Sequence, residues 1–382
     1  MRFSSLISSS ITALLMVGGS SAFSPSATQQ TLSSSRTSST KLFNIPPPSV
    51  DDIEGFKAYA DKQAAPASFF ELQSDCLRST QLAIRDGFDL LEIEFPPLPA
   101  NVLDLDDVSA YDVAQANLKL ALDLARGFIK TADEPQKISI LFPDESEAQI
   151  GVESLTGQED VGAITELEPG IVISSLRRSE EGDDRILKPE QTFLNLFGGG
   201  GKTGDVKPLN GTDVYICLVA SAQELPDIEE LHEQVKGVPI IFYNLKLDIL
   251  RGDLGAPAFP SKEFQDRFLS RVKPVYYLRT RQYSRSTTKP PFLVNYQGCL
   301  FRAYPGQYQT LLDTGTGSYR RLLGSNIRPA LGEFKEQLTQ ALRDEGILPA
   351  DEGSTLNFLR TGYKTTTWWE EEREDASMDW MT

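Results

Sequence analysis

Between residues 66 and 275 the apolar positions form short continuous runs separated by longer stripes of helical spacing. The runs at 90–95, 138–142, 171–176, 214–219 and 239–243 predict strands. Leu118, Leu122, Ala125 and Ile129 recur at spacings of four, three and four, which predicts a helix, and further helices are expected at 66–87, 226–235 and 263–272. Continuous apolar strands separated by helices predict a doubly wound, mostly parallel α/β sheet of the Rossmann-like kind.

The pattern changes after residue 272. Apolar runs at 275–278, 292–303, 308–312 and 319–323 lie too close together for crossover helices, so we expect antiparallel strands joined by turns. Pro305-Gly306 and the glycines at 315–317 supply those turns. A last apolar stripe over 331–342 predicts a closing helix, which completes the predicted fold class.

The first fifty residues have the composition of two consecutive targeting signals. Arg2 precedes an apolar run at 6–17, too short for a membrane span of roughly 20 residues, and small residues follow, which predicts a signal peptide over 1–22. Residues 23–50 are rich in Ser and Thr and contain no acid up to Pro48, which predicts a plastid transit peptide and linker. Ser21-Ala22-Phe23-Ser24-Pro25 resembles the cleavage motif of diatoms and related algae with secondary plastids. We therefore predict a location in the plastid stroma or on the stromal face of the thylakoid.

The rest of the chain divides into a single α/β domain at 51–346 and an acidic tail at 347–382. No apolar stretch of the mature chain approaches spanning length, so we predict no transmembrane segment. All three tryptophans lie in the tail, at Trp368, Trp369 and Trp380. Because Trp is enriched at interfaces, a docking tail is predicted; a strap packed on its own domain, or disorder, are the alternatives.

Composition narrows the possible partners and chemistry. The chain holds 54 acidic and 37 basic residues, a net charge of −17, which argues against nucleic acid as a partner. Its three cysteines are far apart in sequence and predict buried free thiols, not a disulfide framework. His232 is the only histidine and is expected on the solvated face of a helix. We assign no catalytic residues, no metal ligands and no cofactor.

Two loop motifs favour structural interpretations. Gly198–Thr203 resembles a phosphate-binding loop, but Leu196 stands where the first glycine belongs and no helix follows, so a flexible connection is predicted. Asn210-Gly211-Thr212 fits a glycosylation sequon and is predicted to be a turn before a strand.

Two sets of charged residues on predicted strands are further candidates for a functional role. Glu92 and Glu94 share one face of a strand, and we expect a solvated pair. The basic cluster at 279–285 could meet phosphate or an acidic protein surface, or could be a solvated strand end and loop.

Four short motifs carry a resemblance to a known family. They are Asp227-Ile228-Glu229-Glu230-Leu231, Ile240-Ile241-Phe242-Tyr243-Asn244, the segment Phe301 to Tyr308 with Tyr304-Pro305-Gly306, and Ile327-Arg328-Pro329. Over residues 66–346 the chain resembles the domain of unknown function of the chloroplast and cyanobacterial Low PSII Accumulation protein type. Leu245 and Tyr308 depart from the pattern, which usually has Pro and Trp there.

The resemblance implies a role in photosystem II assembly or accumulation, without established catalytic residues. Its partners would be a photosystem II core subunit or other thylakoid assembly proteins, met through peripheral association with the thylakoid. We therefore expect a non-catalytic assembly factor; the alternative is a small-ligand enzyme or sensor using the crevice beyond the carboxyl ends of the parallel strands. The candidate functional surface comprises Asp144, Asn244, Arg302, Tyr304, Pro305, Gly306 and Arg328.

Overall fold

The chain divides into two units, residues 1–47 and 48–382, and the computed structural model describes residues of the second. The described residues are 65–99, 102, 108–158, 162–178, 204–248, 260–287, 290–316, 318–349 and 376–382. The predicted leader, the glycine-rich loop at 198–203, Trp368 and Trp369 lie outside these residues. None of the described helices combines the length and apolar composition needed to cross a membrane.

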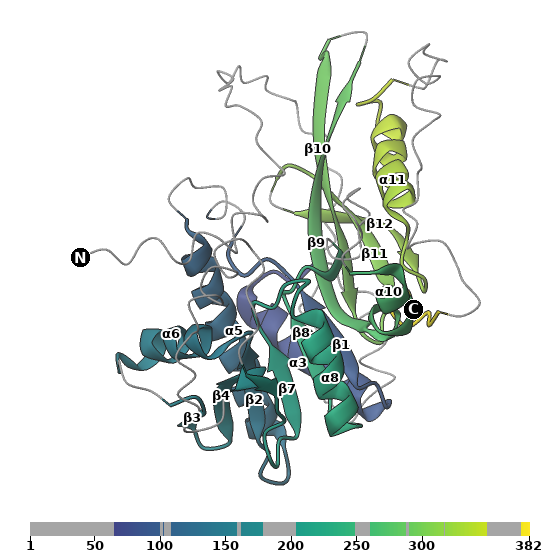
Figure 1. The fold of residues 1–382 in the computed structure, drawn as a ribbon. Helices are drawn as coiled ribbons and strands as arrows, with labels where there is room; N and C mark the ends of the chain where they lie inside the picture. The colour runs from purple at the N-terminus through teal and green to yellow at the C-terminus, as the bar shows by residue number, and fades with distance from the viewer. Residues whose placement is uncertain are drawn as a thin grey trace, which may run out of the picture. The chain divides into compact units, whose positions relative to one another are not determined.

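A ten-stranded sheet forms the centre of the described fold (Figure 1), in the order β12-β11-β10-β9-β1-β8-β7-β2-β4-β3. Its parallel strands are β1 (Leu90–Glu94), β2 (Ile138–Phe142), β4 (Ile171–Ser175), β7 (Val214–Cys217), β8 (Ile240–Tyr243) and β9 (Lys273–Ser286). The antiparallel strands are β3 (Thr165–Glu168) at one edge and β10 (Leu293–Ala303), β11 (Tyr308–Asp313) and β12 (Tyr319–Ser325) at the other. Two short strands, β5 (Arg177–Arg178) and β6 (Asp205–Val206), pair separately. The predicted fold class is confirmed.

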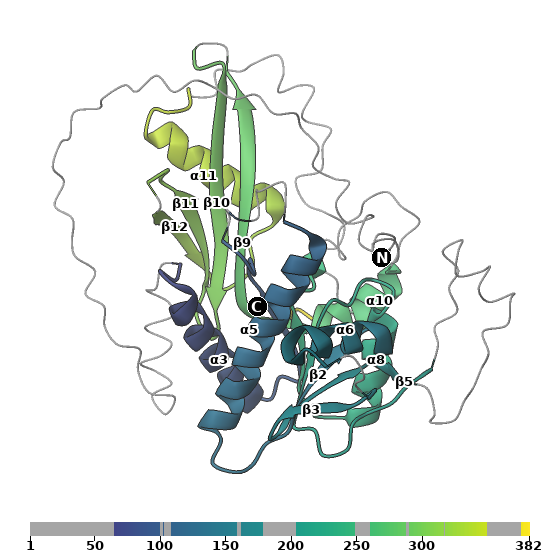
Figure 2. The same cartoon turned by 90° about the vertical axis from the view of Figure 1, so that its left-hand side faces the viewer.

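Helices cover both faces of the sheet (Figures 1 and 2). On one face α3 (Phe69–Arg85), α5 (Ala110–Thr131) and α6 (Glu145–Thr156) enclose a core that includes Ile140 and Ile216. On the other face α8 (Leu225–Val235), α10 (Lys262–Arg267) and a 3-10 turn (Leu269–Arg271) bury the alternate residues, among them Cys217. The helix α11 (Leu331–Asp344) covers the antiparallel strands with its own apolar cluster. Burial from both sides explains why the central strands are continuously apolar.

The structure confirms most predicted elements and adds others. Asn210 and Gly211 form the predicted turn before β7, where Gly211 has a φ of +70°. The apolar pattern did not reveal α6 and β3. The strand predicted at 275–278 is longer, because β9 continues through the basic cluster to Ser286, and it pairs antiparallel with β10 but parallel with β1. Short amphipathic or half-exposed segments lack the strong apolar pattern on which such predictions depend.

The prediction that His232 is solvated is wrong. His232 lies on α8 with only 9% of its surface exposed, and its Nε2 lies 2.9 Å from Asp89 Oδ2. Its ring also lies 6.2 Å from the ring of Phe268, at the junction of α10 and the 3-10 turn. The acidic residues around His232 in the sequence suggested a polar face, but the imidazole points toward the sheet and ties α8 to the segment that precedes β1.

Candidate functional site

The carboxyl ends of β7 and β8 carry unusual backbone conformations. Among the described residues other than glycine, three have a positive φ: Val219 at 60°, Asn244 at 54° and Lys246 at 55°. All three follow these two strands within three residues. A β-branched residue such as Val219 is a true outlier in this region, and such strain persists only where the surroundings enforce it. In a doubly wound sheet this edge is also where ligands bind.

Asn244 fixes the end of β8 to its neighbours. Its Oδ1 accepts a hydrogen bond from the Phe95 amide at 2.8 Å, and its Nδ2 donates to Asn117 Oδ1 on α5 at 2.8 Å. Asn tolerates the left-handed region better than most residues, because its short side chain can bond locally. Asn244 therefore joins β8, β1 and α5 at the carboxyl edge.

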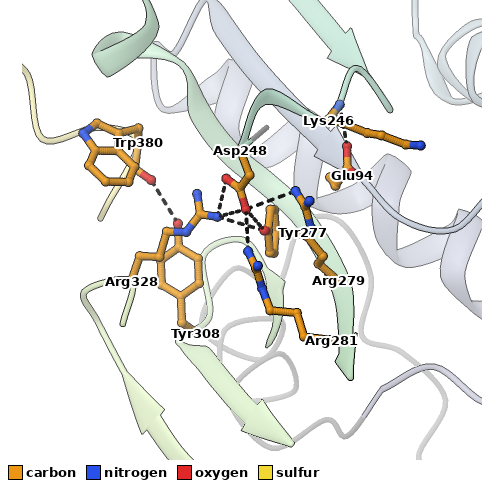
Figure 3. Close-up of polar contacts among 9 residues, drawn as sticks. All are labelled: Glu94, Lys246, Asp248, Tyr277, Arg279, Arg281, Tyr308, Arg328 and Trp380. Carbon is orange, nitrogen blue, oxygen red and sulfur yellow. Dashed lines mark hydrogen bonds and ion pairs between the residues drawn. The ribbon is translucent and has the colours of Figure 1, made fainter. Parts of the chain in front are cut away.

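Beyond Asn244 the chain delivers Asp248 into a buried cluster of charges (Figure 3). Arg328 Nη2 lies 2.5 Å from both carboxylate oxygens of Asp248, and the Tyr277 hydroxyl donates to the same carboxylate. From β9, Arg279 Nη1 approaches Asp248 Oδ2 to 3.2 Å and Arg281 Nη2 to 3.3 Å. We name these residues, Asp248, Tyr277, Arg279, Arg281 and Arg328, the Asp248 cluster.

The geometry of β9 explains how the cluster assembles. Tyr277, Arg279 and Arg281 stand at alternate positions and so project from one face of the strand. Their face meets the loop after β8 on one side and Arg328 on the other. For the basic cluster at 279–285, the sequence allowed either a binding role or a solvated strand end. In the structure, Arg279 and Arg281 of this cluster pair with the buried carboxylate of Asp248. The pairing joins segments up to 80 residues apart.

The prediction of a solvated Glu92–Glu94 pair is wrong, because both side chains are buried at 1% and 7% exposure. They lie on the same sheet face as the Asp248 cluster. The Lys246 amide donates a hydrogen bond to Glu94 Oε2 at 3.0 Å, which holds the left-handed turn against β1. Burial raises the pKa of Glu94 to about 7, although the nearby Arg279 guanidinium opposes that shift.

The raised pKa of Glu94 predicts a pH dependence of stability. Between its ordinary pKa of 4.5 and about 7, the folded state binds more protons than the unfolded state, so stability falls as pH rises. A shift of this size corresponds to a loss on the order of 3 kcal/mol across that window. Glu94→Gln keeps an acceptor for the Lys246 amide but cannot ionise. Its unfolding free energy relative to the parent chain should therefore increase as pH rises, as measured by urea unfolding at both ends of the window.

The exposed Glu134 provides the control for this measurement. Glu134→Gln should leave the pH profile of the parent chain unchanged, because an exposed carboxyl is not desolvated by folding. Parallel profiles for Glu94→Gln and the parent chain would show that Glu94 is ionised with an ordinary pKa.

A second group of cations surrounds the described residues 376–382. Arg302 donates from Nη1 to the Thr382 carbonyl at 2.7 Å, and Lys273 Nζ lies 3.1 Å from Thr382 Oγ1. Arg302 also stacks 4.5 Å from the centroid of the Tyr308 ring. Burial, together with the charge of Arg302, lowers the pKa of Lys273 to about 8. The cations thus hold the polypeptide of 376–382 in place.

Trp380, predicted to belong to a docking tail, is buried at 6% exposure against the Asp248 cluster. Its amide donates to the Ser270 carbonyl at 3.1 Å, and its ring lies 5.7 Å from the Arg328 guanidinium (Figure 3). The Arg328 amide donates to the Met381 carbonyl at 2.7 Å. Trp380 therefore packs on its own domain, which is the strap interpretation and not the docking one.

The remaining candidate residues occupy other places. Tyr304 donates its hydroxyl to Asp86 Oδ2 at 2.6 Å, in the turn before β1, and Tyr304-Pro305 is a cis peptide that leads into Gly306. Asp144 caps α6 by accepting the Glu147 amide at 2.9 Å. Asp144 and Asn244 thus lie where β2 and β8 end, whereas Tyr304 lies near where β1 begins. The predicted surface is not one site.

Sequence reasoning missed Asp248, the acceptor at the centre of the cluster. A lone acid four residues after the half-buried Asn244 has no motif of its own. The signal that could have found it is the Tyr-x-Arg-x-Arg alternation of β9, which places a hydroxyl and two guanidinium groups on one sheet face and so requires a buried anion. Among the described residues, no three His, Cys, Asp or Glu side chains are arranged to hold a metal ion.

The fold and this cluster define an α/β protein whose parallel sheet is extended by an antiparallel unit and locked by buried ion pairs. The chain belongs to the family described as domain of unknown function DUF1995, which matches residues 66–336. That match spans the sheet from α3 to the first turns of α11. No curated protein and no solved structure matches the chain.

Proposed function

We propose that this protein is a non-catalytic assembly factor that supports accumulation of photosystem II. The proposal starts from the four motifs that resemble the Low PSII Accumulation type, all of which lie within the matched residues 66–336. The partner would be a photosystem II core subunit or another thylakoid assembly protein.

The main support for the proposal is that polar residues of three of these motifs hold elements of the fold together. Asp227 accepts two hydrogen bonds from Arg177, at 2.7 and 2.9 Å, which ties α8 to β5. Asn244 joins β8 to β1, and Arg328 holds Asp248. Polar groups that a ligand site would present at the carboxyl edge are instead bonded to one another. This arrangement suits a rigid binding scaffold better than a site of turnover.

The proposed location is the plastid stroma or the stromal face of the thylakoid. It rests on the composition of residues 1–50, which combines a signal peptide with a transit peptide. An assembly factor for a thylakoid complex must reach this compartment, so leader and proposed role agree.

A strain that lacks the protein tests the proposal. We expect photosystem II cores to accumulate to a lower level, while transcripts of their subunits stay near normal, because the defect lies in assembly. Immunoblots and transcript quantification measure the two quantities. The full chain should restore accumulation, and a chain without residues 1–50 should not, because it would stay outside the plastid. Normal photosystem II levels in the null strain would exclude this function.

The alternative is a small-ligand enzyme or sensor, favoured by the strained Val219 and by the pKa of Glu94 near 7 at the carboxyl edge. Complementation of the strain that lacks the protein separates the two functions. A chain carrying Glu94→Gln should restore photosystem II if Glu94 is a structural residue. If the variant accumulates normally but does not restore the complex, Glu94 acts in chemistry or ligand binding.

A further inference from the structure

Charge is distributed unevenly between the two halves of the sheet. Residues 273–328, which contain β9 to β12, hold nine basic side chains and one acidic side chain, Asp313. Their net charge is +8, so the remainder of the chain carries −25. Four of these cations pair with Asp248 or Glu345, which lie outside this range, and counting both acids leaves a surplus of 8 − 2 = +6. The antiparallel unit therefore stays positive in an acidic protein, and an anionic surface would attract one side of the domain and repel the other.

The longest part of this basic unit is the β9–β10 hairpin. From Lys273 to Ala303 it has no acidic residue, and its strands pair in continuous register as far as Ser286 and Leu293. The Thr287 amide closes its far end on the Phe292 carbonyl at 2.9 Å. Both views show that this end extends past α11 (Figures 1 and 2). The hairpin thus projects its tip away from the helices that cover its base.

Two apolar side chains are exposed at this tip. Phe292 is 65% exposed and Leu293 is 54% exposed. Phe292 directly precedes β10 and Leu293 is its first residue, so the two neighbouring side chains make this end of the hairpin apolar. Below the tip, one face carries uncharged polar pairs, Ser284 with Asn295 and Gln282 with Gln297. Among the residues that the structure describes, none covers these two apolar side chains.

We propose that the tip of the β9–β10 hairpin, Phe292 and Leu293, inserts into the surface of a membrane that contains anionic lipid. A stable protein interface buries about 800 Å² on each partner, far more than two side chains on a projecting tip can supply. A lipid surface requires only a few inserted apolar groups supported by basic residues. The basic hairpin and the acidic remainder together orient the protein with the tip toward the lipid. This inference deepens the peripheral membrane association of the proposed function and names its surface.

Vesicle binding tests the proposal with residues 48–382, the compact unit that holds every described element. We expect the protein to sediment with vesicles of equal parts phosphatidylglycerol and phosphatidylcholine, and less with phosphatidylcholine alone. Added salt should weaken binding, because the basic residues are screened. The double variant Phe292→Ser with Leu293→Ser should lower the partition coefficient roughly tenfold or more, since two inserted apolar side chains are lost. Its thermal unfolding should match the parent, because both residues are exposed.

Phe70→Ser is the matched control, because Phe70 is 83% exposed but lies on α3, which packs on the base of β9 and β10 and not at the hairpin tip (Figure 2). It should bind vesicles as the parent does. Equal loss in both variants, equal binding to the two kinds of vesicle, or no binding at all would overturn the proposal. A dimer that the hairpin variant alone abolishes would assign the tip to a second copy of the chain. If the protein does not bind vesicles but the null strain has reduced photosystem II, the assembly role stands and only the proposed lipid contact is excluded.

Discussion

Asp248→Asn is expected to destabilise the protein by about 3–5 kcal/mol, because it removes the carboxylate that three arginines approach in a buried site. Asp248 is 7% exposed, and Arg328 is 5% exposed. Without the charge of Asp248, the Arg328 guanidinium stays desolvated with neutral partners in the cluster, the amide oxygen that the substitution leaves and the Tyr277 hydroxyl at 2.8 Å. Urea unfolding at constant pH measures the loss.

Two further variants make this result specific. Asp133→Asn changes an exposed acid in the loop after α5 and should shift the unfolding free energy by less than about 0.5 kcal/mol. Arg328→Met in the Asp248→Asn background should recover part of the lost stability, because it removes the buried charge left unpaired. Additive effects of the two substitutions would contradict direct coupling between Asp248 and Arg328.

Trp380→Ala should also cost about 3–5 kcal/mol, the range for truncation of a large buried aromatic side chain. The Trp380 indole covers Arg328 and lies beside Tyr308, whose hydroxyl points to the Trp380 carbonyl at 3.4 Å. Removal of the ring leaves a cavity beside a buried guanidinium group. The free energy of unfolding of the variant, from urea denaturation, measures the effect.

Phe70→Ala provides the comparison, because Phe70 is a large aromatic residue that is exposed. Its truncation should change stability by less than about 0.5 kcal/mol. If Trp380→Ala unfolds like the parent chain, residues 376–382 do not contribute to the fold, and a docking role of the whole tail becomes the better interpretation. For Trp368 and Trp369, which lie outside the described residues, docking stays a prediction.

Much of the fold was predictable from local pattern. A strand that is buried on both faces is usually apolar at most positions, so β8, and β2 with Ser139 as its one polar residue, are visible in the sequence as apolar runs. A helix packed on a sheet must repeat its apolar residues every three or four positions, as Leu118 and Leu122 on α5 do. The family resemblance, too, was carried by short motifs whose residues lie at the ends of such elements.

The candidate site was less accessible, because burial of a charged residue leaves no periodic signal. Glu92 and Glu94 alternate with apolar residues, which is the pattern of a half-solvated strand, and β1 is nevertheless buried at every position. His232 stands among acidic neighbours and yet faces the core. In each case the identity of the residue indicated water, whereas an element distant in sequence covers the side chain.

Most helices, the parallel strands of the centre and the division of charge between the two halves of the sheet follow from the sequence alone. These properties depend on residues close together in the chain or on composition. The contact between Asp248 and Arg328, 80 residues apart, and the packing of Trp380 on Arg328 are visible only in the folded chain. Such contacts depend on which elements the sheet brings side by side. An isolated acid or arginine has the same local pattern whether it faces water or a buried partner, and only the folded chain supplies that partner.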